Sequence, residues 1–332
     1  MTPFRTLYCF LLIVILSSCG FQDGKMKLAF TGAPSEVVCE VPQYLWENGA
    51  DTAFQKVFFA NYPALPQPEY MFNLLHYKPK EINQLLRCHR NYVKLSIDTS
   101  LEAGQIKKIA DKFSRDQIYF EIAVPSYHAM MPYLQDALPY ISEQIREKER
   151  TRFVQTHRGK NLPLTNKVKE KFNIQINAPV GFKLAKEKNH FLWFNRERVR
   201  TLSGTGHDIT DGLLIFETPY SDSSSVSEKA VYAQINQFLA EVPGPAENSH
   251  MILEMKYYLE GRNINFSQNF ARECRGLWKM DGAFMGGSFI SLSIPHFQKG
   301  RIVHVLGFVY APKFNKREFV KELESMVYSV QF

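Results

Sequence analysis

The sequence predicts an α+β protein of two α/β halves, in which helices pack on mixed or antiparallel sheets. First, 45% of its 332 residues are apolar, which suffices for one large core or two ordinary ones. Second, strand-like and helix-like segments alternate in the first half, whereas strands are followed by a helix, twice, in the second. Third, a charge-rich stretch over residues 143–171 separates the two patterns. This composition excludes a disordered or fibrous protein, and a net charge of +7 spread along the chain is not a nucleic-acid-binding signature.

Residues 1–18 have the pattern of a secretory signal peptide. Arg5 supplies a positive charge, and residues 7–16 form an apolar run of ten. Because a membrane-spanning helix needs about 20 apolar residues, this run is too short to span a bilayer. The polar residues from Gln22 to Lys25 end the apolar segment soon afterwards.

The four residues Leu16-Ser17-Ser18-Cys19 directly end the apolar run. They resemble the lipobox of bacterial lipoproteins, in which small residues precede a cysteine that receives fatty acyl chains. This resemblance implies that cleavage after Ser18 leaves Cys19 as the first residue of the mature chain, acylated with chains such as palmitate. Because each buried CH₂ contributes about 0.8 kcal/mol, two or three chains hold a protein on a membrane essentially permanently. Residues 19–33 then form a lipidated tether.

The first half is predicted to span residues 34–158. Its strand-like segments are residues 36–41, 71–77, 92–97 and 118–124. Apolar residues recur at helical spacing from Pro42 to Phe58, over residues 82–86 and over residues 106–113. A long helical pattern then runs from Met131 to Arg152, where Pro132 and Pro139 are expected to bend or segment it. We interpret its charged end as a solvated helix end rather than a binding site.

The second half is predicted to span residues 159–332. Its strand-like segments are residues 172–176, 181–185, 190–194, 212–217, 289–294 and 302–310, the last two joined by a turn at Gly300. Ser225 and Glu228 have the spacing of a capping box before a helical pattern that ends near Leu239. Asn315 and Glu318 have the same spacing before the final helix.

One cluster in the second half is the main candidate for a binding surface. Its members are Arg275, Trp278, Met285, Gly286 and Gly287. Glycine pairs allow a close backbone approach, and arginine and tryptophan are favoured in recognition. The alternative is a β-bulge or tight turn beside a buried tryptophan.

A glycine-containing loop is a weaker candidate, for binding an anion through backbone amides. Its candidate residues are Gly204, Gly206, His207 and Asp208. A solvent-exposed loop between strands is the alternative. Asp208, Asp211 and Glu217 are acid or base candidates whose spacing predicts no pair. The proline-rich segment from Tyr62 to Phe72 is either a partner-binding edge or a rigid crossover packed on the core.

Motifs of the familiar catalytic and metal-binding classes are absent from the sequence. The nine histidines form no HExxH pattern, and no GxSxG, SxxK, Walker A or GxGxxG motif is present. The sequence therefore predicts no catalytic residue, no metal site and no cofactor. After loss of the signal peptide and acylation of Cys19, three cysteines remain: Cys39, Cys88 and Cys274. Three buried thiols are favoured over a single bridge between Cys39 and Cys88.

Three motif clusters, together with the lipobox, carry a resemblance over the chain from Pro34 to its end. They are Leu65-Pro66-Gln67-Pro68 with Phe72; Arg275-Gly276-Leu277-Trp278 with Phe284-Met285-Gly286-Gly287; and Gly307-Phe308-Val309-Tyr310-Ala311-Pro312 with Lys316-Arg317-Glu318. The chain resembles a family of Bacteroidetes envelope lipoproteins classified only as a domain of unknown function. Ser288 departs from the family pattern, where proline is expected. The resemblance implies a location and boundaries, and it implies no reaction or substrate.

We therefore expect a lipid-anchored envelope protein on the periplasmic face of the outer membrane. Its expected role is that of a binding or assembly component, with the membrane as one partner through the acyl chains on Cys19. An envelope protein or polymer is the other expected partner, and nucleic acid is not. The alternative is an envelope hydrolase that acts on a glycan, peptide or ester with a non-local active site. A carrier of lipid or small apolar ligands would require a deep apolar cavity.

Overall fold

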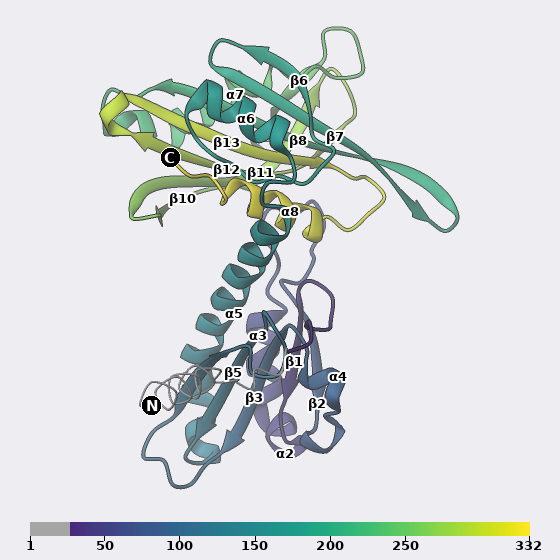
Figure 1. The fold of residues 1–332 in the computed structure, drawn as a ribbon, viewed down its shortest axis with the longest axis vertical. Helices are drawn as coiled ribbons and strands as arrows, with labels where there is room; N and C mark the ends of the chain where they lie inside the picture. Colours follow the sequence, from purple (N-terminus) through teal and green to yellow (C-terminus); the bar gives the residue numbers. More distant parts are fainter. Residues whose placement is uncertain (1–26) are drawn as a thin grey trace, which may run out of the picture.

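A computed structural model describes residues 27–332. The signal peptide and Cys19 lie outside the described residues, as does most of the expected tether. Two bodies, each built on one β-sheet, are joined by the long helix α5 (Tyr127–His157) (Figure 1). The predicted α+β class, with helices packed on mixed and antiparallel sheets, is confirmed. No helix within residues 27–332 has the length and apolar character needed to cross a membrane.

The N-terminal half contains a five-stranded mixed sheet in the order β2-β1-β3-β5-β4. Its strands are β1 (Glu36–Glu40), β2 (Asn73–Tyr77), β3 (Asn91–Ile97), β4 (Gln105–Ala110) and β5 (Ile118–Val124). The strands are parallel except β4, which pairs antiparallel with β5. The four predicted strands of this half are therefore present.

Strand β4 corrects the helix predicted over residues 106–113. Ile106 packs into the core beneath α5, whereas Ile109 packs on the opposite face of the sheet. In a strand, residues three apart point to opposite faces. Helices or loops cover both faces of this sheet. Two apolar residues three apart, which in a helix would share one face, therefore each enter a different core in this strand.

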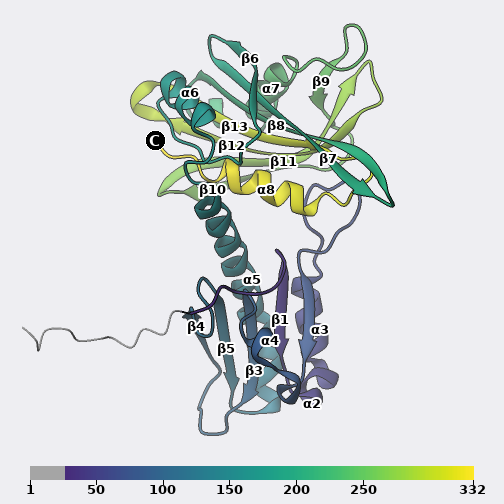
Figure 2. The ribbon, with the colours of Figure 1, turned by 45° about the vertical axis from the view of Figure 1, so that its right-hand side comes forward.

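Helices cover the two faces of this sheet unequally. Besides α5, the helical segments of this half are α2 (Gln43–Leu45), the π-helical turn η2 (Trp46–Ala50), α3 (Asp51–Phe58), the 3₁₀ turn η3 (Pro79–Glu81) and α4 (Gln84–Arg87). Helices α3 and α5 enclose the main core on one face, and α4 lies on the other (Figure 2). Helix α5 continues through Pro132 and Pro139 as one helix, so of the two expected effects, a bend or a break, the break does not occur. The buried row Leu134, Leu138 and Ile141 anchors the helix along this stretch.

The C-terminal half contains an antiparallel sheet in the order β10-β11-β12-β13-β8-β7-β6, with β9 added beside β11. Its strands are β6 (Lys183–Lys188), β7 (Phe191–Leu202), β8 (Thr205–Pro219), β9 (His250–Leu253), β10 (Leu259–Phe266), β11 (Asn269–Asp281), β12 (Gly286–His296) and β13 (Arg301–Tyr310). Helices α6 (Leu162–Phe172) and α8 (Arg317–Val327) pack on one face, and α7 (Glu228–Leu239) packs on the other. Two 3₁₀ turns, η4 (Ser223–Val226) and η5 (Phe297–Lys299), complete the half.

Three local predictions in this half need correction. The strand predicted over residues 172–176 is the end of α6 and a segment that forms one bridge, between Gln175 and Gln331. Ser227 rather than Ser225 caps α7, because its side chain accepts the Ala230 amide proton. Helix α8 has no capping side chain of its own.

The three cysteines Cys39, Cys88 and Cys274 are buried free thiols, as favoured from the sequence.

Candidate functional site

The cluster predicted as a binding surface lies largely inside the C-terminal half. Arg275 and Trp278, both on β11, are only 3% and 1% exposed. The Trp278 ring packs edge-on against Phe308 at 5.4 Å between ring centroids. Gly286 and Gly287 open β12, and a Cβ on Gly287 would lie 2.0 Å from the carbonyl oxygen of Val309. These glycines therefore allow close strand packing beside a buried tryptophan, and Met285 is partly buried in the same core.

The candidate anion loop is the tip of a hairpin. Ser203 and Gly204 join β7 to β8 with positive φ angles of 50° and 80°, as a tight hairpin turn requires. Gly206, His207 and Asp208 continue as part of β8, paired with residues 199–201 of β7. These residues are paired in the sheet, and the chain continues from the turn as a strand. The turn is therefore not followed by a loop or a helix whose backbone amides could surround an anion. Within the described part of the chain, no group of three or more metal-ligating side chains comes together.

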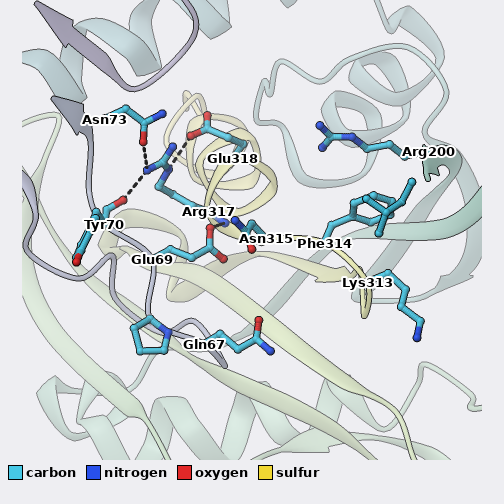
Figure 3. A pocket seen from close by; sticks show the side chains of 12 residues that line it. Gln67, Glu69, Tyr70, Asn73, Arg200, Lys313, Phe314, Asn315, Arg317 and Glu318 are labelled. Atoms are coloured by element: carbon cyan, nitrogen blue, oxygen red, sulfur yellow. Dashed lines mark hydrogen bonds and ion pairs between the residues drawn. The ribbon is translucent and has the colours of Figure 1, made fainter. Parts of the chain in front are cut away.

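A cleft of about 740 Å³ lies where three separate segments meet, at the junction of the two halves (Figure 3). The proline-rich segment contributes Glu69 and Tyr70, β7 contributes Arg200, and the connection from β13 into α8 contributes Lys313 and Phe314. The proline-rich segment runs from α3 towards the C-terminal sheet before it returns into β2 (Figure 1). It is therefore both a rigid crossover and a wall of the cleft.

Glu69 builds one side of this cleft by capping α8 from the other half of the molecule. Its carboxylate accepts the backbone amide protons of Lys316 at 2.5 Å and Arg317 at 3.1 Å. A carboxylate at this position satisfies free amides and interacts favourably with the helix dipole. Arg317 in turn donates to the Tyr70 carbonyl oxygen at 2.7 Å and to Asn73 Oδ1 at 3.2 Å. The start of α8 and the proline-rich segment thus hold each other in place.

Two cations on the other side of the cleft have no ionic partner among the described residues. Arg200 and Lys313 lie on either side of Phe314 (Figure 3), and both are exposed. The Arg200 guanidinium lies over the Phe314 ring, 5.3 Å from its centroid. By contrast, Arg317 is already neutralised by Glu318 at 2.8 Å. The cleft therefore presents two free positive charges beside an aromatic ring.

Behind the cleft, a buried ionic network joins the halves through Glu324 of α8. Its carboxylate, 3% exposed, accepts from Arg275 at 3.0 Å, from Arg150 at 2.8 Å and from Arg146 at 3.3 Å. The Tyr62 hydroxyl donates to the same carboxylate. Burial by itself would raise the pKa of Glu324, but the three guanidinium groups together hold this pKa well below its usual value.

This network corrects two predictions, the surface role of Arg275 and the solvated end of α5. Arg275 pairs with Glu273 and Glu324, so its role is internal. The charged run near the end of α5 is not a solvated helix end, because Arg146 and Arg150 point at α8 and Arg152 is 4% exposed. Asp211 is also internal and pairs with Arg196 and Arg198, while Glu217 pairs with Arg301. No short sequence motif connects the partners, which are separated by more than 100 residues in several cases.

One serine–histidine pair lies within the hydrogen-bond distance found in hydrolases, but a substrate cannot reach it. Ser293 Oγ and His304 Nδ1 are 2.8 Å apart, and His304 Nε2 lies 2.9 Å from Thr218 Oγ1. Ser293 and His304 are both completely buried in the C-terminal sheet. Burial lowers the pKa of His304 to about 3, which keeps the ring neutral. This trio is a satisfied polar group inside the core.

Comparison with family models divides the chain near the end of α5. A model described as Domain of unknown function (DUF4837) matches residues 161–329, just over half of the chain. The chain belongs to the DUF4837 family. A second model, described as Domain of unknown function (DUF8532), matches residues 31–158 of this DUF4837 protein. The resemblance to a family classified as a domain of unknown function is therefore confirmed.

Two solved structures show a partial likeness to this DUF4837 protein. They are the Ran-binding protein Mog1p of Saccharomyces cerevisiae and a point mutant of Mog1. Each is 14% identical, and each match covers 48% of this chain and 89% of the Mog1 chain, with a TM-score of 0.30. This likeness is too slight to support an argument about fold or partner. No curated protein matches the chain.

Proposed function

We propose that this DUF4837 protein is a lipid-anchored, periplasm-facing component of the cell envelope that binds an acidic protein or polymer in its junctional cleft. The observation that carries the binding role is the pair of unneutralised cations, Arg200 and Lys313, on a cleft of about 740 Å³. Of the five charged residues that line the cleft, Glu318 pairs with Arg317 and Glu69 caps α8. Arg200 and Lys313 therefore remain to attract an anion over the Debye length, about 8 Å at physiological salt. The acylated Cys19 would keep this cleft beside the membrane.

The cleft is prepared for binding because its walls are held independently of any partner. The Glu69 cap and the Arg317 contacts fix the start of α8, and Arg200 stacks on Phe314. A rigid site loses less conformational entropy on binding than a flexible one. The ligand would be an acidic segment of a protein or polymer, because the charges of the cleft that have no ionic or capping partner are both cations.

A charge reversal tests the cleft. The double variant Arg200→Glu, Lys313→Glu should weaken binding of fluorescent poly-L-glutamate at least tenfold, measured by anisotropy at low salt. The control variant Lys229→Glu, Lys299→Glu has the same change of charge at exposed positions outside the cleft. Equal affinities of the two double variants would refute the cleft as the binding site.

A separate experiment tests the anchor. Wild-type protein should sediment with outer membranes and resist extraction by high salt, and Cys19→Ser should move it to the soluble periplasmic fraction. Protease added to spheroplasts should degrade the wild-type chain if it faces the periplasm. If Cys19→Ser still sedimented with membranes after a high-salt wash, lipid anchoring through this cysteine would be wrong.

A further inference from the structure

The first described residues of the chain are held on the surface of the N-terminal half. Lys27 Nζ donates to the Asp111 carbonyl oxygen, and the Leu28 carbonyl oxygen accepts the Arg115 amide proton at 2.8 Å. Asp111 and Arg115 lie in the turn of residues 111–117, which joins β4 to β5. An anchor upstream of these residues would therefore connect to the N-terminal half at this point.

Helix α4 and its end border the same segment on the other side. The Thr31 amide donates to the Cys88 carbonyl oxygen at 3.0 Å, and the Thr31 hydroxyl donates to the Leu85 carbonyl oxygen at 2.8 Å. The first described segment thus lies between α4 and the turn that joins β4 to β5. We call the three segments together the tether surface; they are residues 27–31, 83–88 and 111–117.

The tether surface exposes apolar and basic side chains together. Leu28 and Leu85 are 72% and 69% exposed. Arg87 and Arg115 are also exposed, and neither forms an ion pair with any side chain of residues 27–332. Apolar side chains beside basic ones are typical of protein surfaces that rest on a bilayer, because the apolar groups enter the boundary of the acyl chains while the cations meet lipid phosphates.

The charge of the tether surface has the sign that anionic phospholipids attract. The surface carries four basic side chains and two acidic ones. One of the acidic residues, Asp116, already pairs with Lys148 and, at 3.5 Å, with Arg152. Each basic residue close to an anionic bilayer strengthens binding about fivefold, so the two unpaired arginines contribute about 25-fold. This attraction is weak for a protein that is free in solution.

The short distance in sequence between Cys19 and Lys27 makes this weak attraction effective. Eight peptide units join the two residues, and an extended chain spans at most about 3.6 Å per residue. The tether surface therefore stays within about 29 Å of an acylated Cys19. Binding between linked partners is intramolecular, and its effective concentration is far above that of the free protein. A contact that is weak in solution can thus be occupied beside the bilayer.

We propose that the tether surface is a second membrane contact, which lays the N-terminal half on anionic phospholipids. Its two exposed leucines enter the headgroup region, and its two unpaired arginines bind lipid phosphates. The contact depends on the proposed lipid anchor, since acylation of Cys19 brings the surface to the bilayer. It adds an orientation to that anchor, because it determines which face of the protein is turned to the membrane.

The experiment places a polarity-sensitive fluorophore at Leu28→Cys in the purified, acylated full-length chain. Its matched control is Val199→Cys, at a position that is 71% exposed on the C-terminal half. The thiols of Cys39, Cys88 and Cys274 are buried, so the label attaches to the new cysteine. The chain is reconstituted into vesicles of equimolar phosphatidylcholine and phosphatidylglycerol. Emission from position 28 should shift to the blue and lose at least half its intensity to doxyl-labelled lipid, whereas emission from position 199 should do neither.

A charge reversal separates contact from mere closeness to the bilayer. In the Leu28→Cys chain, Arg87→Glu with Arg115→Glu should abolish both the blue shift and the quenching, while the chain still floats with the vesicles. Lys229→Glu with Lys299→Glu has the same change of charge outside the tether surface and should preserve both signals.

Two results would overturn the membrane contact while the anchor stands: equal signals at positions 28 and 199, or undiminished quenching after the reversal of Arg87 and Arg115. The anchor has its own readout, since mass spectrometry detects acyl chains on Cys19 and flotation detects attachment to vesicles. A chain without acyl chains, or one that does not float, would overturn the anchor and with it the contact.

Discussion

The buried carboxylate of Glu324 makes a quantitative prediction about stability. In Glu324→Gln the shape is kept, but three guanidinium groups lose their shared negative charge. The Arg275, Arg146 and Arg150 side chains are only 4%, 14% and 17% exposed, so water replaces the carboxylate poorly. Removing one partner of a buried ion pair costs about 3–5 kcal/mol. Because Arg275 keeps its pair with Glu273, we expect about 3 kcal/mol.

Urea denaturation measures this loss. With a slope of about 3 kcal/mol per molar urea, a loss of about 3 kcal/mol lowers the midpoint by about 1 M. Tryptophan fluorescence reports on both halves, since Trp46 lies in the N-terminal half and Trp193 and Trp278 lie in the C-terminal half. Glu187→Gln removes an exposed carboxylate that also pairs with lysines, and it should leave the midpoint nearly unchanged. If both variants had the same midpoint, the network would not stabilise the fold as argued.

Three further changes have defined outcomes. Glu69→Ala removes the cap of α8 and should lower the free energy of unfolding by about 1–2 kcal/mol, measured by urea denaturation. Burial opposes ionisation of Glu273, but Arg275 and Arg262 lower its pKa in the folded protein to about 2. As the pH falls, the unfolded chain therefore binds this proton at a higher pH than the folded protein does, and stability is lost. Stability should therefore drop by about 3 kcal/mol from pH 5 to pH 2, and Glu273→Gln should flatten that slope in acid titrations followed by circular dichroism. Gly287→Ala places Cβ against the Val309 carbonyl oxygen and should lower the melting temperature by several degrees, whereas no decrease would show that β12 can shift.

The sequence predicted the parts of the fold in which local pattern and burial agree. Residues 92–97 and 118–124 alternate or are continuously apolar because they are central strands, and the final helix has one strongly apolar face. Strand β4 was mistaken for a helix because an edge strand between two cores contributes one apolar residue to each. Helix α6 was missed because its charged outer face hides the short buried row Leu164, Val168 and Phe172.

The candidate site was not predictable from local patterns for a different physical reason. The cleft and the network take residues from five segments that are distant in the sequence, and the pattern of each segment taken alone indicates only an ordinary strand, helix or loop. Arg146 and Arg150 have the spacing of a solvated helix face, and only the approach of α8 buries them. Glu69 lies in a proline-rich loop with no sign that its carboxylate caps a helix about 250 residues later. Ion pairs of this kind follow from tertiary packing, which a single sequence does not encode in any short motif.

Helix α5 has a practical consequence for anyone who divides this protein into fragments. Its 31 residues extend about 46 Å at 1.5 Å per residue, and they belong to both cores, with Ile141 in the first and Phe153 against the second. A fragment that starts at residue 161 would lack two of the three guanidinium groups around Glu324. A fragment that ends at residue 158 would leave Phe153 facing water. The segments that match the two family models are therefore better expressed as one polypeptide, because helix α5 contributes side chains to the core of each half.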